Sequence, residues 1–158
     1  MNVRLVPATQ THFALLLDGQ PPEPEVALPD TPVAEPEVLA MLAGLAEAVS
    51  ALFTPSAWLI VAGDELVGLM SVTSVLDEGR LQIGYGVAPG SQGRGHASAA
   101  VAALVGWAQS DDRVKALYAE TRTDNIASQR VLERGGFVRT GERLDEEDGA
   151  LFCWQVDC

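Results

Sequence analysis

The spacing of hydrophobic positions along the chain predicts a long amphipathic helix in its first third. Pro36 suits the first turn of a helix, and apolar residues then recur with helical period as far as Leu52. The stripe consists of Val38, Met41, Leu42, Leu45, Val49 and Leu52. We expect this stripe to lie in the core rather than to line a substrate groove.

Three other segments are typical of helices. Residues 97–108 are apolar around most of the helix circumference, which indicates a buried helix. Residues 125–134 form a further helix, which the glycines at 135 and 136 end. A short helix is expected after Thr9, a plausible N-cap. Its apolar face consists of Phe13, Leu16 and Leu17.

Runs rich in β-branched and apolar residues predict the strands. They cover residues 2–6, 57–62, 66–76, 81–87, 114–120, 137–142 and 150–156. Glycine-containing turns at 63–65 and 77–79 separate the central strands. The acidic run at 145–149 lacks the regular ligand alternation of a calcium loop, so we expect a solvated turn in the last hairpin.

A proline-rich loop interrupts this pattern at residues 20–37. It holds six prolines, and the segment before it is too short to fold alone, so we interpret it as a loop within one domain. The 158 residues suit a single domain, 1–158, of the α/β class with α+β character.

Composition narrows the class of protein. At 47% hydrophobic residues the chain can bury a core, and no run of about 18 apolar residues predicts a membrane span. The N-terminus lacks the features of a secretory signal. Cys153 and Cys158 have no metal-ligand spacing and are too few to form a disulfide framework, which favours a cytoplasmic protein without a metal.

The net charge of -12 argues against a nucleic-acid partner, because binding nucleic acid needs a basic surface. The acidity favours either plain solubility or attraction of a cationic acceptor such as an amine or a basic protein.

The chemistry concentrates at residues 81–108, where a strand, a glycine-spaced turn and a helix follow one another. Free N–H groups at a helix start and flexible glycines before it can hold a phosphate, and Arg94 adds a charge suited to phosphate. The alternative is a left-handed turn that only joins the two elements. The turn lacks the lysine of a P-loop and is too long for a dinucleotide fingerprint.

The pattern Gln-x-x-Gly-x-Ala at residues 92–97 resembles the acetyl-CoA loop of the GCN5-related N-acetyltransferase (GNAT) superfamily. Residues 125–137 are similar to the late helix and following Gly-Phe of that superfamily, and the resemblance covers roughly residues 58–154. The nearest branch includes ribosomal-protein alanine N-acetyltransferases, where Asn-x-x-Ser replaces a later tyrosine. The resemblance implies a mixed, mostly antiparallel sheet whose fourth and fifth strands, 81–87 and 114–120, splay apart. It also implies that the proline-rich loop lies over the acceptor pocket.

The resemblance implies acetyl-CoA as co-substrate, without a metal, and carries binding roles onto named positions. These are Val87, Gln92, Gly93, Arg94, Gly95, His96, Ala97, Asn125, Ser128 and Arg130. It implies that a backbone N–H at or next to Val87 stabilises the developing oxyanion, and Ser128 is our candidate for the leaving thiolate. Ser128 could instead bond the carbonyl four residues before it.

The general base is less defined. Gln82 and Ala99 stand where relatives carry glutamates, and Leu132 stands where many carry a tyrosine. Glu120, at the end of a splayed strand, is the candidate base, with His96 or a water chain as alternatives. An α-amine costs about 1 kcal/mol to deprotonate at pH 7 and a lysine about 4.6 kcal/mol, so a weak base favours an α-amine or another low-pKa amine.

Three functions remain open. The first is an N-acetyltransferase acting on a primary amine, either a protein N-terminus or a small molecule. The second is a non-catalytic acetyl-CoA-binding or sensor domain, and the third is a dinucleotide-binding enzyme. We expect Tyr85 and Tyr118 to be packing residues, and an exposed sheet edge near the C-terminus could pair in a homodimer.

Overall fold

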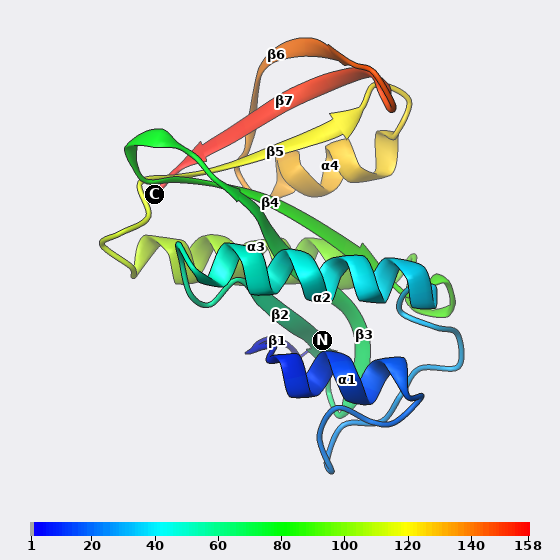
Figure 1. The fold of residues 1–158 in the computed structure, drawn as a ribbon. Helices are drawn as coiled ribbons and strands as arrows, with labels where there is room; N and C mark the ends of the chain where they lie inside the picture. Colours follow the sequence, from blue (N-terminus) through cyan, green and yellow to red (C-terminus); the bar gives the residue numbers. More distant parts are fainter. Residues whose placement is uncertain (1) are drawn as a thin grey trace.

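The computed structural model describes residues 2–158 and contains a seven-stranded sheet in the order β1-β2-β3-β4-β5-β7-β6 (Figure 1). The strands are β1 Val3–Pro7, β2 Ala57–Ala62, β3 Glu65–Val75, β4 Arg80–Val87, β5 Ala116–Arg122, β6 Val138–Asp145 and β7 Gly149–Asp157. The helices are α1 Gln10–Leu17, α2 Pro36–Ser50, α3 His96–Gln109 and α4 Ile126–Arg134, with single 3-10 turns at Asp77–Gly79 and Pro89–Ser91. All neighbouring strands are antiparallel except β4 and β5, so the predicted fold class is confirmed.

Most predicted elements lie within two residues of their observed bounds. The fifth strand begins at Ala116 instead of at residue 114, because the Val114 N–H bonds the Asp111 carbonyl in a turn. The last hairpin is longer than predicted, and β7 lies between β5 and β6. Among the residues that the structure describes, no helix is long and apolar enough to cross a membrane.

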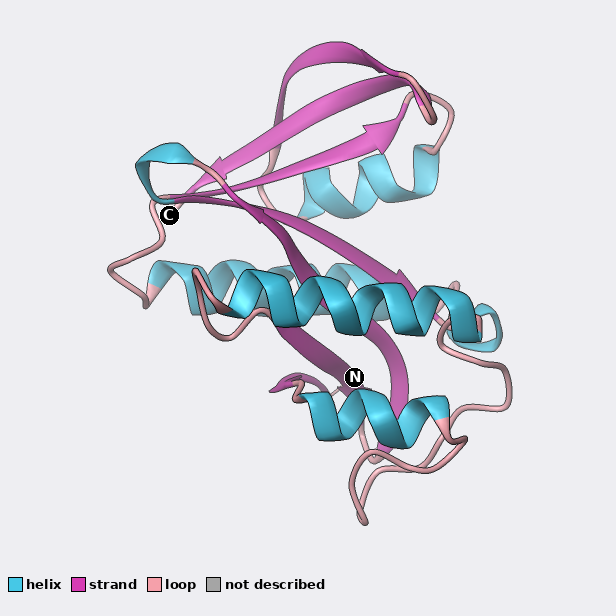
Figure 2. Ribbon diagram, viewed as in Figure 1, coloured by secondary structure: helices cyan, strands magenta, loops and turns pink. Residues whose placement is uncertain are grey.

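Helices cover both faces of the sheet (Figure 2). Side chains alternate between the faces of a strand, so each face has its own core. Ile83 of β4 packs with Leu104 of α3 in one core cluster. Leu69 of β3 packs with Phe13 of α1 and Leu39 of α2 in the other. The sheet is therefore buried from α3 on one side and from α1 and α2 on the other.

The predicted apolar stripe of α2 is only partly a core stripe. Leu39, Ala46 and Val49 are the buried residues of this helix. Val38 is 40% exposed and Met41 60% exposed, so the expectation of a core position was wrong for both. The same holds for Leu52, which follows the end of the helix. The buried face of α2 is therefore narrower than the apolar periodicity predicted.

The two halves of the sheet separate after three paired residues. β4 and β5 pair only from Arg80 to Gln82 and then diverge, as the resemblance implied (Figure 1). On the other side of β4, Gly68 of β3 and Gly86 approach so closely that a Cβ on Gly68 would fall on the Gly86 carbonyl oxygen. This glycine contact lets β4 stay close to β3 beyond the point where β4 leaves β5.

The proline-rich loop is fixed at two points. The Leu66 N–H donates to the Ala27 carbonyl at 2.9 Å, which ties the loop to β3. The Gly90 N–H donates to Thr31 Oγ1 at 2.8 Å, which ties it to the turn that follows β4. The loop therefore reaches from the β2–β3 hairpin to the glycine turn.

Candidate active site

The turn between β4 and α3 is built around two left-handed glycines. Gly93 has φ 78° and Gly95 has φ 79°, a conformation that other residues rarely adopt. Gly95 is the N-cap of α3, with no side-chain cap and no acidic residue in the first turn. No side chain of the cap or first turn neutralises the positive end of the α3 dipole, so the first N–H groups of the helix can bind an anion.

A cavity of about 640 Å³ opens at this turn and runs into the gap between β4 and α4. Every residue predicted to bind acetyl-CoA lines it except Arg94, which is exposed beside it. The lining also includes Arg134, so Arg130 and Arg134 place two cations at the α4 side. A long, anionic ligand such as CoA fits this combination of helix start, glycine turn and arginines.

His96 lies under the turn. The residue is 8% exposed, and its Nδ1 has no hydrogen-bond partner among residues 2–158. A buried polar atom without a partner is rare in native proteins, and this one belongs to a residue of the cavity lining. His96 Nδ1 is therefore a buried polar atom without a partner, directly beneath the glycine turn.

The backbone of Val87 faces the gap. The Ala88 N–H donates to the Val67 carbonyl at 2.7 Å, and residues of an antiparallel pair alternate between facing the partner and facing away. The N–H and carbonyl of Val87 therefore point away from β3, and Gln92 Nε2 donates to that carbonyl at 3.0 Å. The Val87 N–H remains directed into the cavity.

Ser128 and Tyr85 meet across the cavity. The Tyr85 hydroxyl lies 2.8 Å from Ser128 Oγ, so Ser128 bonds a phenol instead of the carbonyl four residues before it. Burial raises the pKa of Tyr85, and the hydrogen bond with Ser128 offsets part of that increase. Tyr85 is thus a protonated phenol at neutral pH. It contacts Ser128, the residue predicted to donate a hydrogen bond to the leaving thiolate.

Asn125 holds the start of α4. Its Oδ1 accepts the Ser128 N–H at 3.1 Å, which is an N-cap bond. This cap fixes Ser128 in the first turn of α4, beside Tyr85. Asn125 is exposed and also lines the cavity.

Glu120 lies apart from this cavity. Arg143 donates two bonds to its carboxylate, one of them from Nη2 to Oε1 at 2.7 Å. Tyr118 donates to Oε2 at 2.7 Å, and Gln82 donates more weakly at 3.4 Å. The Arg143 bonds, followed by the Tyr118 bond, lower the pKa of Glu120 against the opposing effect of burial. The candidate base is therefore a well-paired carboxylate.

A second cavity, of about 240 Å³, lies on the α2 side of the sheet. Val33 and Ala34 of the proline-rich loop, together with Val38 of α2, form part of its wall. Tyr85 and Gly86 line both cavities, so the two meet at β4. The α2-side cavity and the cavity at the glycine turn therefore adjoin the same part of β4.

Sequence reasoning missed the position of Tyr85, which we expected only to pack. One signal was available, because Tyr85 stands between Gly84 and Gly86 in a strand that otherwise carries large side chains. Its partner Ser128 lies 43 residues away, which no local pattern reveals.

Comparisons with known proteins agree with this geometry. The family model for the acetyltransferase (GNAT) domain matches residues 2–138. An uncharacterized N-acetyltransferase, YjdG of Bacillus subtilis, is 33% identical over 84 residues. That match covers 51% of this chain and 50% of YjdG, so the chain spans about half the length of the curated relative it matches.

Two solved structures share the fold. One is a Salmonella typhimurium acetyl transferase that modifies the N-terminal serine of ribosomal protein L7/L12, with TM-score 0.73, 18% identity, and coverage of 100% of this chain and 96% of that one. The other is aminoglycoside acetyltransferase AAC(6')-Ib with coenzyme A and kanamycin, with TM-score 0.69, 19% identity, and coverage of 99% and 95%. The chain belongs to the GNAT acetyltransferase domain family.

Proposed function

We propose that this protein is an N-acetyltransferase that moves the acetyl group of acetyl-CoA directly to a primary amine. The observation that carries the proposal is the convergence of the Val87 N–H, the Ser128 hydroxyl and the glycine turn on one cavity at the gap between β4 and α4. Family membership and the CoA complexes of structural neighbours support the same reaction.

The proposed binding site follows the cavity lining. The N–H groups at the start of α3 and the turn of Gly93 and Gly95 hold the diphosphate, and Arg130 contributes charge from α4. Gln92 keeps the turn against β4 through its bond to the Val87 carbonyl. Arg94, which does not line the cavity, acts at longer range or on the exposed end of the ligand.

Two groups stabilise charge in the proposed reaction. The Val87 N–H donates to the acetyl oxygen as it becomes negative, because this N–H has no partner on β3. Ser128 donates to the sulfur as the carbon–sulfur bond breaks. Burial keeps Tyr85 protonated, and in the proposed reaction its hydroxyl is the donor to Ser128 Oγ, which turns the serine hydrogen toward the leaving group.

The amine loses its proton before or during attack, and the product thiol gains one, so the reaction balances without an added oxidant or metal. Glu120 was the candidate base from the sequence, but it lines neither cavity and Arg143 lowers its pKa, so it is at most a weak base for the bound amine. A weak base suits an acceptor that is substantially neutral near pH 7. This favours an α-amine over a lysine side chain.

The test is acetyl-CoA-dependent release of free thiol in the presence of candidate amines. The expected result is release that depends on an added α-amine and exceeds the release with a lysine side chain. Equal turnover of both acceptors at neutral pH would contradict the weak-base argument. Binding of acetyl-CoA without thiol release from any amine would indicate a non-catalytic binding domain instead.

A further inference from the structure

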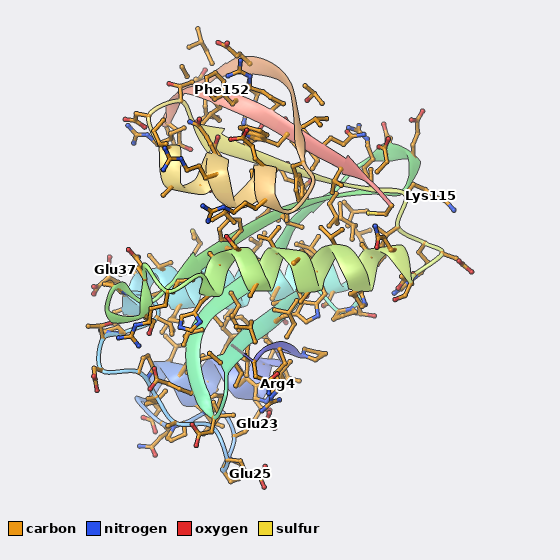
Figure 3. The ribbon with its side chains drawn as sticks, turned by 180° about the vertical axis from the view of Figure 1, so that it is seen from behind. Arg4, Glu23, Glu25, Glu37, Lys115 and Phe152 are labelled. Carbon is orange, nitrogen blue, oxygen red and sulfur yellow. The ribbon has the colours of Figure 1, made fainter. Side chains whose placement is uncertain are left out.

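The cavity on the α2 side has a lining without charge. It is formed by Val33, Ala34, Val38, Leu42, Leu69, Ser71, Thr73, Gly84, Tyr85 and Gly86. Two hydroxyls, one phenol and backbone groups are its polar elements, and the other side chains are small and apolar. Glu37, the acidic residue next to Val38, is exposed at the outer end of α2 and does not line the cavity (Figure 3).

Two glycines of β4, Gly84 and Gly86, line this cavity. Leu69 and Ser71 pair with Gly86 and Gly84, so these positions share the α2 face of the sheet. A Cβ on Gly86 would meet nothing within 4 Å, which means that it would point into open space. Gly86 therefore leaves room against the β4 backbone, whereas a Cβ on Gly84 would lie 3.3 Å from Thr73 Cγ2.

The carboxylate of Glu120 is already hydrogen-bonded by other side chains. Glu120 receives two bonds from Arg143 and one from Tyr118. It lines neither cavity, so a second ammonium group in the α2-side cavity finds no counter-charge there. Burying a charge without a partner is costly, whereas apolar groups gain from leaving water.

From these observations we infer that the acceptor amine is carried on a small, uncharged and mainly apolar group, which occupies the α2-side cavity. This inference rests on the proposed function and narrows its substrate class. The cavity of about 240 Å³ is smaller than the roughly 300–1,000 Å³ of drug-sized ligand sites, so a large polyamine sugar does not fit. A peptide N-terminus with a small uncharged first residue and a simple aliphatic monoamine both satisfy this chemistry.

The test compares matched acceptors that differ in charge. The tripeptides Val-Gly-Gly and Asp-Gly-Gly form one pair, and butylamine and 1,4-diaminobutane form the other. We expect kcat/KM to be higher for the uncharged member of each pair by at least about tenfold. The peptide pair and the amine pair, compared with each other, distinguish a peptide acceptor from a small molecule.

A substitution in the cavity wall tests whether the wall itself causes the difference between charged and uncharged acceptors. Val38 lines the cavity in the first turn of α2, where an added carboxylate is compatible with a helix start. Val38→Asp is expected to raise the kcat/KM ratio of diaminobutane to butylamine about tenfold. Met41→Asp, on the same helix but outside the lining, is the control and leaves this ratio within about twofold.

The outcomes separate the inference from the proposed function. Preference for the uncharged acceptors, with the switch in Val38→Asp alone, supports the inference. Thiol release that is equal or faster with the charged acceptors overturns the inference and leaves the N-acetyltransferase proposal standing. No release with any acceptor, although acetyl-CoA binds, overturns both.

Discussion

At the scale of single residues, the contact between Tyr85 and Ser128 gives the site a donor chain that its sequence motif does not contain. Relatives with a late tyrosine would carry it at the position of Leu132. In this protein Leu132 of α4 is fully buried in the core. The phenol in this protein comes from β4 instead and reaches the same cavity from the opposite wall.

This contact predicts non-additive effects on turnover. Ser128→Ala should lower kcat about a hundredfold, as loss of one transition-state donor does, and Tyr85→Phe about tenfold. The double variant should be no slower than Ser128→Ala, because Tyr85 acts through Ser128. The KM for acetyl-CoA should stay within about threefold, since the glycine turn carries the binding. Steady-state kinetics measure all three, and multiplicative losses in the double variant would refute the linkage.

The pairing of Glu120 predicts a pH dependence of stability. Its folded-state pKa lies below its ordinary value of 4.5, so the pair stabilises fully above that pH and loses its effect as the pH falls below it. Glu120→Gln should therefore lower Tm at pH 7, and the difference from the wild type should shrink toward pH 3. Glu142→Gln, at an exposed position of β6, is the control. A difference in Tm that is constant with pH would show that the charge of Glu120 is not the cause.

At the scale of elements, the site depends on how β4 lies between β3 and β5. β4 is paired with β3 along its whole length and with β5 over only three residues. The unpaired half of β4 supplies the Val87 N–H on its open edge, and Gly84 and Gly86 on its α2 face. Because β4 separates from β5, its unpaired half borders both cavities.

Gly68 is expected to be essential to this arrangement. Gly68→Ala places a methyl group on the Gly86 carbonyl and should reduce the free energy of unfolding by about 1–3 kcal/mol. Gly44→Ala is the matched control in the exposed interior of α2, where a Cβ meets nothing within 4 Å and alanine should stabilise by up to about 1 kcal/mol. Urea unfolding distinguishes them, and equal effects of both substitutions would contradict the close contact.

At the scale of the whole molecule, a chain with net charge -12 has to bind an anionic co-substrate. The start of α3, together with Arg130 and Arg134 of α4, supplies the local positive potential. Both arginines of the cavity therefore come from α4, and α3 contributes the N–H groups of its first turn. The predicted homodimer through the exposed β6 edge stays a prediction, which sedimentation velocity can test.

Binding of acetyl-CoA should stabilise the whole fold. At a hundred times its Kd it should add about 2.7 kcal/mol, which for a chain of this length raises Tm by about 5–10 °C. Gly95→Ala strains the turn and should abolish the increase. Gly63→Ala, with a similar φ of 63° in the β2–β3 turn, carries comparable strain and should keep it. Thermal unfolding with and without acetyl-CoA measures the effect, and an unchanged increase in Gly95→Ala would remove the turn from the binding site.

The sequence by itself determined the features that depend on neighbouring residues. The left-handed turn follows from Gly93 and Gly95, the start of α4 from Asn125, and the strand and helix order from the periods of apolar residues. Each of these depends on φ and ψ preferences or on a hydrogen bond within one turn, so the local pattern contains the cause.

Only the tertiary structure decided which distant groups meet. The Tyr85–Ser128 contact spans 43 residues, and Arg143 of β6 reaches Glu120 of β5 across the intervening strand β7. The exposure of Val38 depended likewise on how much of α2 the sheet covers. Strand order and the separation of β4 from β5 fix these contacts, and both result from packing across the whole chain instead of from any local period.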